Sequence, residues 1–99
     1  MSGSLLSAVG MSRKAGRLAP GFDACCIAVE KGAPLVIVAS DAAPRTLRNI
    51  KEKCGGRTRI LITEYTREQF ESVLGKQMAV AAVTDENFAR LIEQAAGNQ

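Results

Sequence analysis

Three short runs of consecutive apolar residues constrain the fold of this chain more than any other feature. They are Leu35 to Ala39, Ile60 to Ile62 and Ala79 to Val83. A strand with one face in water alternates apolar and polar residues, whereas a strand covered on both faces is apolar throughout. The runs therefore predict an α/β fold, a three-layer α/β/α sandwich with helices on both faces of a central sheet.

Segments with helical spacing of apolar residues separate these runs. We expect a helix from Ser4 to about Lys14 and a second that starts at Phe22 and stops at Gly32. Further helices are expected before Gly55, before Gly75 and at the carboxyl end of the chain. The brief apolar segment around Leu18 adds a short strand. We therefore predict a central, mostly parallel mixed sheet of about four strands, with antiparallel pairing open for the short first strand at an edge.

Capping signals mark where the later helices begin. Ser40 or Asp41 is expected to cap the third helix, and Thr66 opens a capping box with Gln69. Thr84 is expected to cap the last helix. Asp41 and Asp85 each follow a predicted strand, where α/β sheets tend to bind ligands. Both also lie at a helix start, so we interpret them as capping residues.

The second helix has one predicted apolar face. Phe22, Cys25, Cys26 and Val29 follow the spacing of residues that face a core. For Phe22 two interpretations remain open at this point. It either packs into the core with that face or is exposed as a contact residue.

Length and composition exclude several classes of protein. The 99 residues, 46% hydrophobic and 23% charged, predict a single domain over residues 1–99. No His is present, so a Ser-His-Asp triad, a Cys-His pair or a His zinc site is excluded within one chain. The three Cys residues have no metal-ligand spacing, and we interpret them as core residues. Phosphate-loop, dinucleotide and nucleophile-elbow motifs are absent, so we expect no enzyme, no cofactor and no metal.

The sequence also has no apolar stretch of the roughly 20 residues that a membrane span needs. Its first residues lack the pattern of a secretory signal. We therefore expect a cytoplasmic monomer with no membrane association.

Positive charge is concentrated in the first part of the chain. Residues 1–59 carry ten Lys or Arg against four Asp or Glu, a net charge of +6, whereas residues 60–99 have a net charge of −3. Such a bipolar molecule can orient toward a polyanion, although an ordinary solvated surface is the alternative.

The cations fall into two sequence clusters. Arg45, Arg48 and Lys51 recur every third residue on the predicted third helix, and further cations follow around the next turn: Lys53, Arg57 and Arg59. The other cluster contains Arg13, Lys14 and Arg17, just before the second helix, whose free N–H groups can hold a phosphate. With no Trp, one Tyr and three Phe, the chain offers little base stacking, which favours a folded RNA recognised by shape.

Several segments together resemble a known family. The run from Arg13 to Gly21 (RKAGRLAPG) is similar to the KAGKL-x-x-G pattern of the kink-turn-binding ribosomal-protein family, the L-seven-Ae type, and specifically its small bacterial YlxQ-like branch. Supporting segments follow in the same order: Ala28 to Gly32, Leu35 to Ala43, Leu74 to Lys76, and Ala82 to Ala89. The resemblance covers nearly the whole chain and implies an α/β/α sandwich that binds structured RNA, ribosomal or otherwise non-coding.

The resemblance also implies where RNA binds. Relatives approach a kink-turn with a Gly-x-Asn-Glu-x-x-Lys pattern at the start of the second helix. Here Gly21 matches, but Asp23, Ala24 and Ile27 replace the Asn, Glu and Lys. The replacements remove one amide, one acceptor and one cation, so we expect reduced affinity for a standard kink-turn.

Two hypotheses follow. The first is a non-catalytic, ribosome-associated RNA-binding protein whose interface contains Lys14, Arg17, Gly21, Phe22, Asp23, Arg45 and Arg48. The alternative is an adaptor on the same scaffold that binds a protein partner, favoured by the altered Asn-Glu-Lys pattern.

Overall fold

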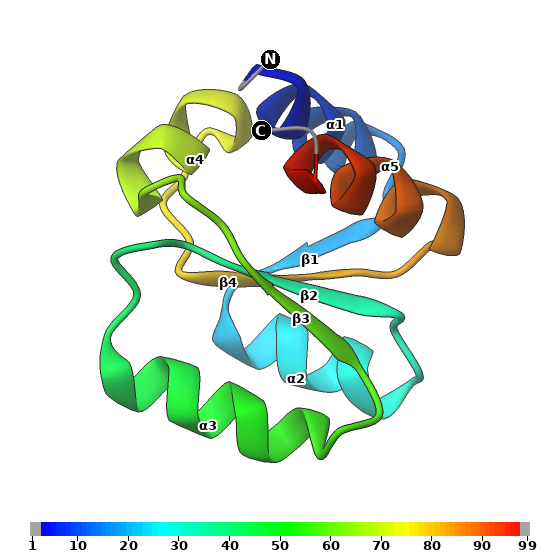
Figure 1. Cartoon of the computed structure of the whole chain (residues 1–99), viewed down its shortest axis with the longest axis vertical. Helices are drawn as coiled ribbons and strands as arrows, with labels where there is room; N and C mark the ends of the chain where they lie inside the picture. Colours follow the sequence, from blue (N-terminus) through cyan, green and yellow to red (C-terminus); the bar gives the residue numbers. More distant parts are fainter. Residues whose placement is uncertain (1–2, 98–99) are drawn as a thin grey trace.

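The computed structural model describes residues 3–97 as five helices packed around a four-stranded sheet (Figure 1). In chain order the elements are α1 (Gly3–Lys14), β1 (Leu18–Pro20), α2 (Phe22–Glu30), β2 (Leu35–Val38), α3 (Pro44–Cys54), β3 (Arg59–Ile62), α4 (Arg67–Leu74), β4 (Val80–Val83) and α5 (Glu86–Gly97). Within this range no helix is long and apolar enough to cross a lipid bilayer.

The three-layer sandwich predicted from the apolar runs is confirmed. Helices α1, α4 and α5 cover one face of the sheet, and α2 and α3 cover the other (Figure 1). The strands serve both cores by alternation: Leu35 and Ile37 of β2 face the first group of helices, whereas Val36 and Val38 face the second. All four residues of β2 are buried, as the unbroken apolar run requires.

The strand order is β1-β4-β2-β3, and the prediction of a mostly parallel sheet is wrong. Strands β2 and β3 pair in parallel, but β4 lies between β1 and β2 and runs antiparallel to both. The expected antiparallel edge position of β1 is confirmed.

The short helix α4 explains the direction of β4. The N–H of Ser40 bonds the carbonyl of Tyr65, and the N–H of Ala39 bonds that of Ala79. Tyr65 precedes α4 and Ala79 follows it, so the chain leaves and returns at the same end of β2. If β4 ran parallel to β2, the chain would first have to return along the length of the strands to their other end.

Strand β3 forms the other edge of the sheet. The predicted burial on both faces is wrong for this strand, because Ile62 is 52% exposed and Ile60 and Leu61 are half-buried. A run of apolar residues therefore predicts burial on both faces for a central strand, which has a neighbouring strand on each side, but not for an edge strand.

The helix caps follow the sequence in part. The capping box of Thr66 and Gln69 is present. The carboxylate of Asp85, and not the side chain of Thr84, accepts the N–H of Phe88 in the first turn of α5, at 3.1 Å. The expected side-chain cap of α3 is wrong: Ala43 is its N-cap residue and carries no capping side chain.

Asp41 acts on a different helix from the one next to it in sequence. Its Oδ1 accepts the backbone N–H of Arg67, at the start of α4, at 2.9 Å. That hydrogen bond, together with the nearby guanidinium, lowers the pKa of the Asp41 carboxyl. Asp41 therefore bonds the first N–H of α4, and the prediction that it caps α3 is wrong.

Candidate nucleic-acid interface

The starts of α2 and α3 lie at the same end of the sheet, where β2 ends and β4 begins. The N–H of Gly21 donates to the carbonyl of Val80 at 2.9 Å, which places the start of α2 beside the start of β4. The N–H of Ala39 donates to Ala79 at 2.8 Å, which brings the loop before α3 to the same place. Helices α2 and α3 begin at this end of the molecule and run alongside each other (Figure 1). We call this end of the molecule the α2/α3 edge.

Gly21 shapes the start of α2. Its φ of 99° and ψ of 157° lie where residues with a side chain are strained, although a Cβ here would meet no atom within 4 Å. The backbone conformation therefore requires glycine, and the available space does not. Gly21 is the N-cap residue and provides no side chain, so the first N–H groups of α2 have no capping partner from a side chain.

The side chains of the first turn of α2 face solvent. Phe22 is 39% exposed and Asp23 is also exposed, whereas Cys25, Ala28 and Val29 are buried. The prediction that Phe22 shares the buried face of the helix is therefore wrong, and its alternative as an exposed residue is confirmed. The helix begins at Phe22, so this ring lies at the rim of the sheet rather than beneath it.

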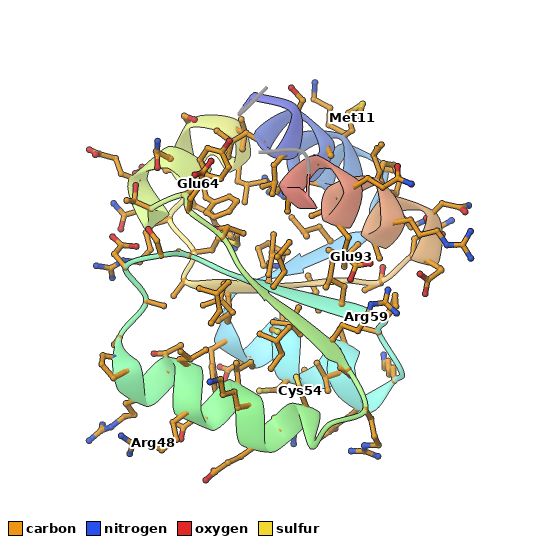
Figure 2. The ribbon with its side chains drawn as sticks, viewed as in Figure 1. Met11, Arg48, Cys54, Arg59, Glu64 and Glu93 are labelled. Atoms are coloured by element: carbon orange, nitrogen blue, oxygen red, sulfur yellow. The ribbon has the colours of Figure 1, made fainter. Side chains whose placement is uncertain are left out.

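Arg45 and Arg48 lie on the first two turns of α3. Pro44 occupies the start of this helix, where its missing N–H has no cost, and no side chain caps the turn. Both arginines are exposed and form no ion pair with any residue in the range 3–97. Figure 2 shows Arg48 directed away from the molecule. The structure thus brings Gly21, Phe22 and Asp23 to the same edge as Arg45 and Arg48.

Lys14 and Arg17 precede β1 in the chain, whereas Gly21 follows it. Lys14 ends α1 and lines a groove with Val73 of α4, and the carbonyl of Arg17 accepts the N–H of Thr84 at the far end of the β1–β4 ladder. At about 3.3 Å per extended residue, Arg17 is roughly 13 Å from Gly21. The predicted cations Lys14 and Arg17 therefore lie before the start of β1, away from Gly21.

Ion pairs neutralise several cations that the sequence placed on the basic side. Lys53 pairs with Glu30, and this contact lowers the pKa of Glu30 and raises that of Lys53. The guanidinium of Arg59 pairs with Glu93 at 2.8 Å and with Glu86 at 3.1 Å. Figure 2 labels Arg59 and Glu93, which lie next to each other. These partners were not visible from sequence, because they are distant along the chain.

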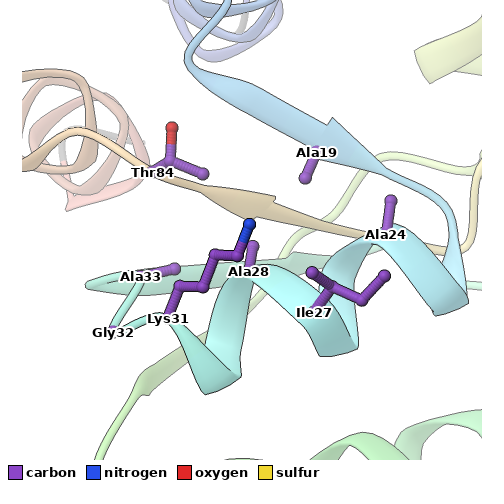
Figure 3. A pocket seen from close by; sticks show the side chains of 8 residues that line it. All are labelled: Ala19, Ala24, Ile27, Ala28, Lys31, Gly32, Ala33 and Thr84. Atoms are coloured by element: carbon purple, nitrogen blue, oxygen red, sulfur yellow. The ribbon is translucent and has the colours of Figure 1, made fainter.

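A hollow of about 460 Å³ lies between α2 and the edge strand β1 (Figure 3). Its walls are mostly small and apolar, and the lining residues are Ala19, Ala24, Ile27, Ala28, Lys31, Gly32, Ala33 and Thr84. Ile27 is 54% exposed. Two positions that depart from the family pattern, Ala24 and Ile27, therefore make this surface apolar. Sequence reasoning did not find the hollow, because its walls come from separate segments.

Two of the three cysteines, Cys25 and Cys54, are buried. Burial, with smaller contributions from the two neighbouring thiols, raises the pKa of Cys25 to about 12, so this residue stays a thiol. Burial also raises the pKa of Cys54. Among the described residues no three groups of metal-binding type lie close enough to hold an ion.

The fold is similar to those of two solved structures. A protein of unknown function from Bacillus halodurans has a TM-score of 0.85 and 28% identity, over 94% of this chain and 96% of that one. A 15.5 kD RNA-binding protein of Giardia lamblia has a TM-score of 0.76 and 18% identity, over 96% of this chain and 83% of that one. No protein-family model matches the sequence, and no curated protein matches it. The chain therefore shares the fold of this RNA-binding protein.

Proposed function

We propose that this protein is a non-catalytic RNA-binding protein that holds a folded RNA at the α2/α3 edge. The observation that carries the proposal is that the starts of α2 and α3, which no side chain caps, meet Arg45 and Arg48, two exposed arginines without an ion pair to any residue in the range 3–97. Phosphates bind well to free N–H groups at a helix start and to exposed guanidinium groups. The shared fold with a Giardia RNA-binding protein supports the same class of partner.

Each predicted residue has a role in this proposal. The bare backbone at Gly21 allows close approach, and Phe22 offers an exposed ring for stacking on an unpaired base. Arg45 and Arg48 bind backbone phosphates. Lys14 and Arg17 reach RNA that extends past β1, and they contribute affinity without sequence selection. The ribosome, rich in folded RNA, is the proposed setting.

The altered recognition pattern sets the expected specificity. Asp23 is exposed in the first turn of α2, where its carboxylate repels phosphates and accepts but never donates a hydrogen bond. Ala24 and Ile27 carry no group that can read a base edge. We therefore propose that the protein recognises bent RNA mainly through its backbone, with lower affinity for a standard kink-turn than relatives that keep the Asn-Glu-Lys pattern.

A titration with two RNAs tests this function. The RNAs are a kink-turn and a straight duplex of equal length and charge, labelled for fluorescence anisotropy. We expect tighter binding of the bent RNA and a loss of affinity in Arg45→Gln/Arg48→Gln. The control Arg90→Gln removes a cation from α5, which lies on the face of the sheet opposite to α2 and α3. Equal binding of both RNAs by the parent protein, or an unchanged affinity of the double variant, would overturn the proposal.

A second candidate function is supported by the hollow beside α2. Its apolar walls and the ammonium of Lys31, which forms no ion pair with any described residue, fit an apolar side chain followed by a carboxylate. Figure 3 shows Ile27 of α2 and Lys31, the residue that follows this helix, among the side chains that line the hollow. A protein-binding adaptor would use this surface. A stable protein partner that is lost in Ile27→Asp, together with no RNA in material purified at low salt, would favour this function.

A further inference from the structure

Ion pairs are unevenly distributed among the described cations. On the α4/α5 side of the sheet, Arg59, Arg67 and Arg90 each pair with a carboxylate. On α3 and its C-terminal turn the exposed cations form no ion pair with any residue between 3 and 97: Arg45, Arg48, Lys51 and Arg57. The remaining cations without an ion pair are spread over other elements: Arg13, Lys14, Arg17, Lys31 and Lys76. Among the described residues, α3 and its C-terminal turn therefore carry four of the nine cations without an ion pair, and Arg13, Lys14 and Arg17 form a second, smaller group.

The cations of α3 form a track that leads away from the α2/α3 edge. At 1.5 Å per residue, successive members of Arg45, Arg48 and Lys51 are about 4.5 Å apart along the axis, and each is turned by about 60°. Arg57 is exposed in the turn that follows the helix, and its Nε lies near Gly55, 4.0 Å from the position of a Cβ there. Glu52 is the single acid on α3, so the net charge of the track is +3. The track is about 15 Å long.

Its composition favours nucleic acid over protein as the partner. A protein interface needs a buried apolar centre, and none of the exposed large apolar residues lies on α3: Met11, Phe22, Ile27, Ile62, Val73 and Leu91. A run of cations without apolar anchors instead matches the regular phosphates of a duplex. The track is therefore long enough to meet several successive phosphates of an A-form RNA stem.

We propose that the outer face of α3 holds the backbone of an RNA stem that continues from the folded element bound at the α2/α3 edge. This inference rests on the proposed function and extends it from one edge to a second surface. Lys51 and Arg57, which are not part of the edge, contact phosphates of the stem and read no base. The bound RNA therefore bends around the N-terminus of α3, at Pro44.

The test compares two RNAs that share the same bent element. One ends directly at the element, and the other carries one additional helical turn of stem. Affinities are measured from 50 to 200 mM salt for the parent protein and for Lys51→Gln/Arg57→Gln. The control Lys53→Gln/Arg90→Gln removes the same charge from two cations that are paired with carboxylates.

For the parent protein we expect the longer RNA to have a salt dependence steeper by about 1.4 to 1.8 logarithmic units per decade, the value for two phosphates. That increment corresponds to roughly a tenfold change over this fourfold range of salt. It should disappear in Lys51→Gln/Arg57→Gln and persist in the control, while binding of the short RNA stays unchanged.

The outcomes separate the two proposals. Should the parent protein bind both RNAs with the same salt dependence, or should the Lys51 and Arg57 variant keep the increment, the α3 track is overturned and the edge remains. Failure of the parent protein to bind either RNA overturns both. Circular dichroism of each variant verifies that these exposed substitutions leave the fold intact.

Discussion

Introducing three polar side chains on α2 is expected to raise affinity for a kink-turn. The variant is Asp23→Asn, Ala24→Glu and Ile27→Lys, which installs the pattern that the resemblance associates with sheared base pairs. The structure allows this change with little cost to folding. Asp23 is exposed, Ile27 is 54% exposed, and Ala24 borders the hollow of about 460 Å³, which has room for a longer side chain.

The size of the expected gain in affinity follows from the contacts that the three side chains add. A good hydrogen-bonded contact to a base edge contributes about 1–3 kcal/mol, which is roughly 5- to 150-fold in affinity. Asn and Glu each add such a contact, and Lys adds a cation near phosphate. Because neighbouring contacts are not additive, we expect a gain of about 10- to 100-fold for the triple variant.

The assay is a titration of kink-turn RNA and of a straight duplex at one fixed salt concentration. The triple variant changes the net charge by +1, so Gln94→Lys, at an exposed position of α5, serves as the charge-matched control. We expect the gain to be specific for the kink-turn. A triple variant that binds no better than Gln94→Lys would refute the assignment of these positions to the interface.

Three further predictions concern the scaffold. Replacing Asp85 by Ala removes the side-chain acceptor at the start of α5 and should lower the free energy of unfolding by about 1 kcal/mol, measured by urea denaturation. The lowered pKa of Asp41 means that its contribution to stability is complete above the unfolded value, near 4, and is lost as pH falls through the folded value; Asp41→Asn should flatten the stability profile in that acidic range. Cys25, with its pKa raised to about 12, should resist alkylation at pH 8 until the protein unfolds, whereas rapid modification of the native protein, detected by mass spectrometry, would contradict its burial.

Local signals predicted the helices well because helix starts and ends are decided within a few residues. The capping box at Thr66, the stop at Gly55 and the helical spacing of α2 all use contacts over one turn. The apolar runs of β2 and β4 identified the central strands, because every side chain of a strand that is covered on both faces must be apolar.

The candidate site was only partly predictable. The positions of Gly21, Phe22, Arg45 and Arg48 at one edge agree with the grouping drawn from sequence, whereas Lys14 and Arg17 are set apart by β1. The exposure of Phe22 was open, because helical spacing alone cannot tell the rim of a sheet from its centre. The hollow beside Ile27 depends on residues from three segments and has no local signature.

The amino-acid sequence by itself determined the alternation of helices and strands, the two apolar cores and the excess of cations in the first part of the chain. Only the tertiary structure decided that β4 runs antiparallel between β1 and β2, that Asp41 bonds the start of α4, and which cations pair with a carboxylate among the described residues. The physical reason is distance along the chain. Caps and periodicity depend on neighbours a few residues apart, whereas strand pairing and ion pairs such as Arg59 with Glu93 join residues that only the completed fold brings together.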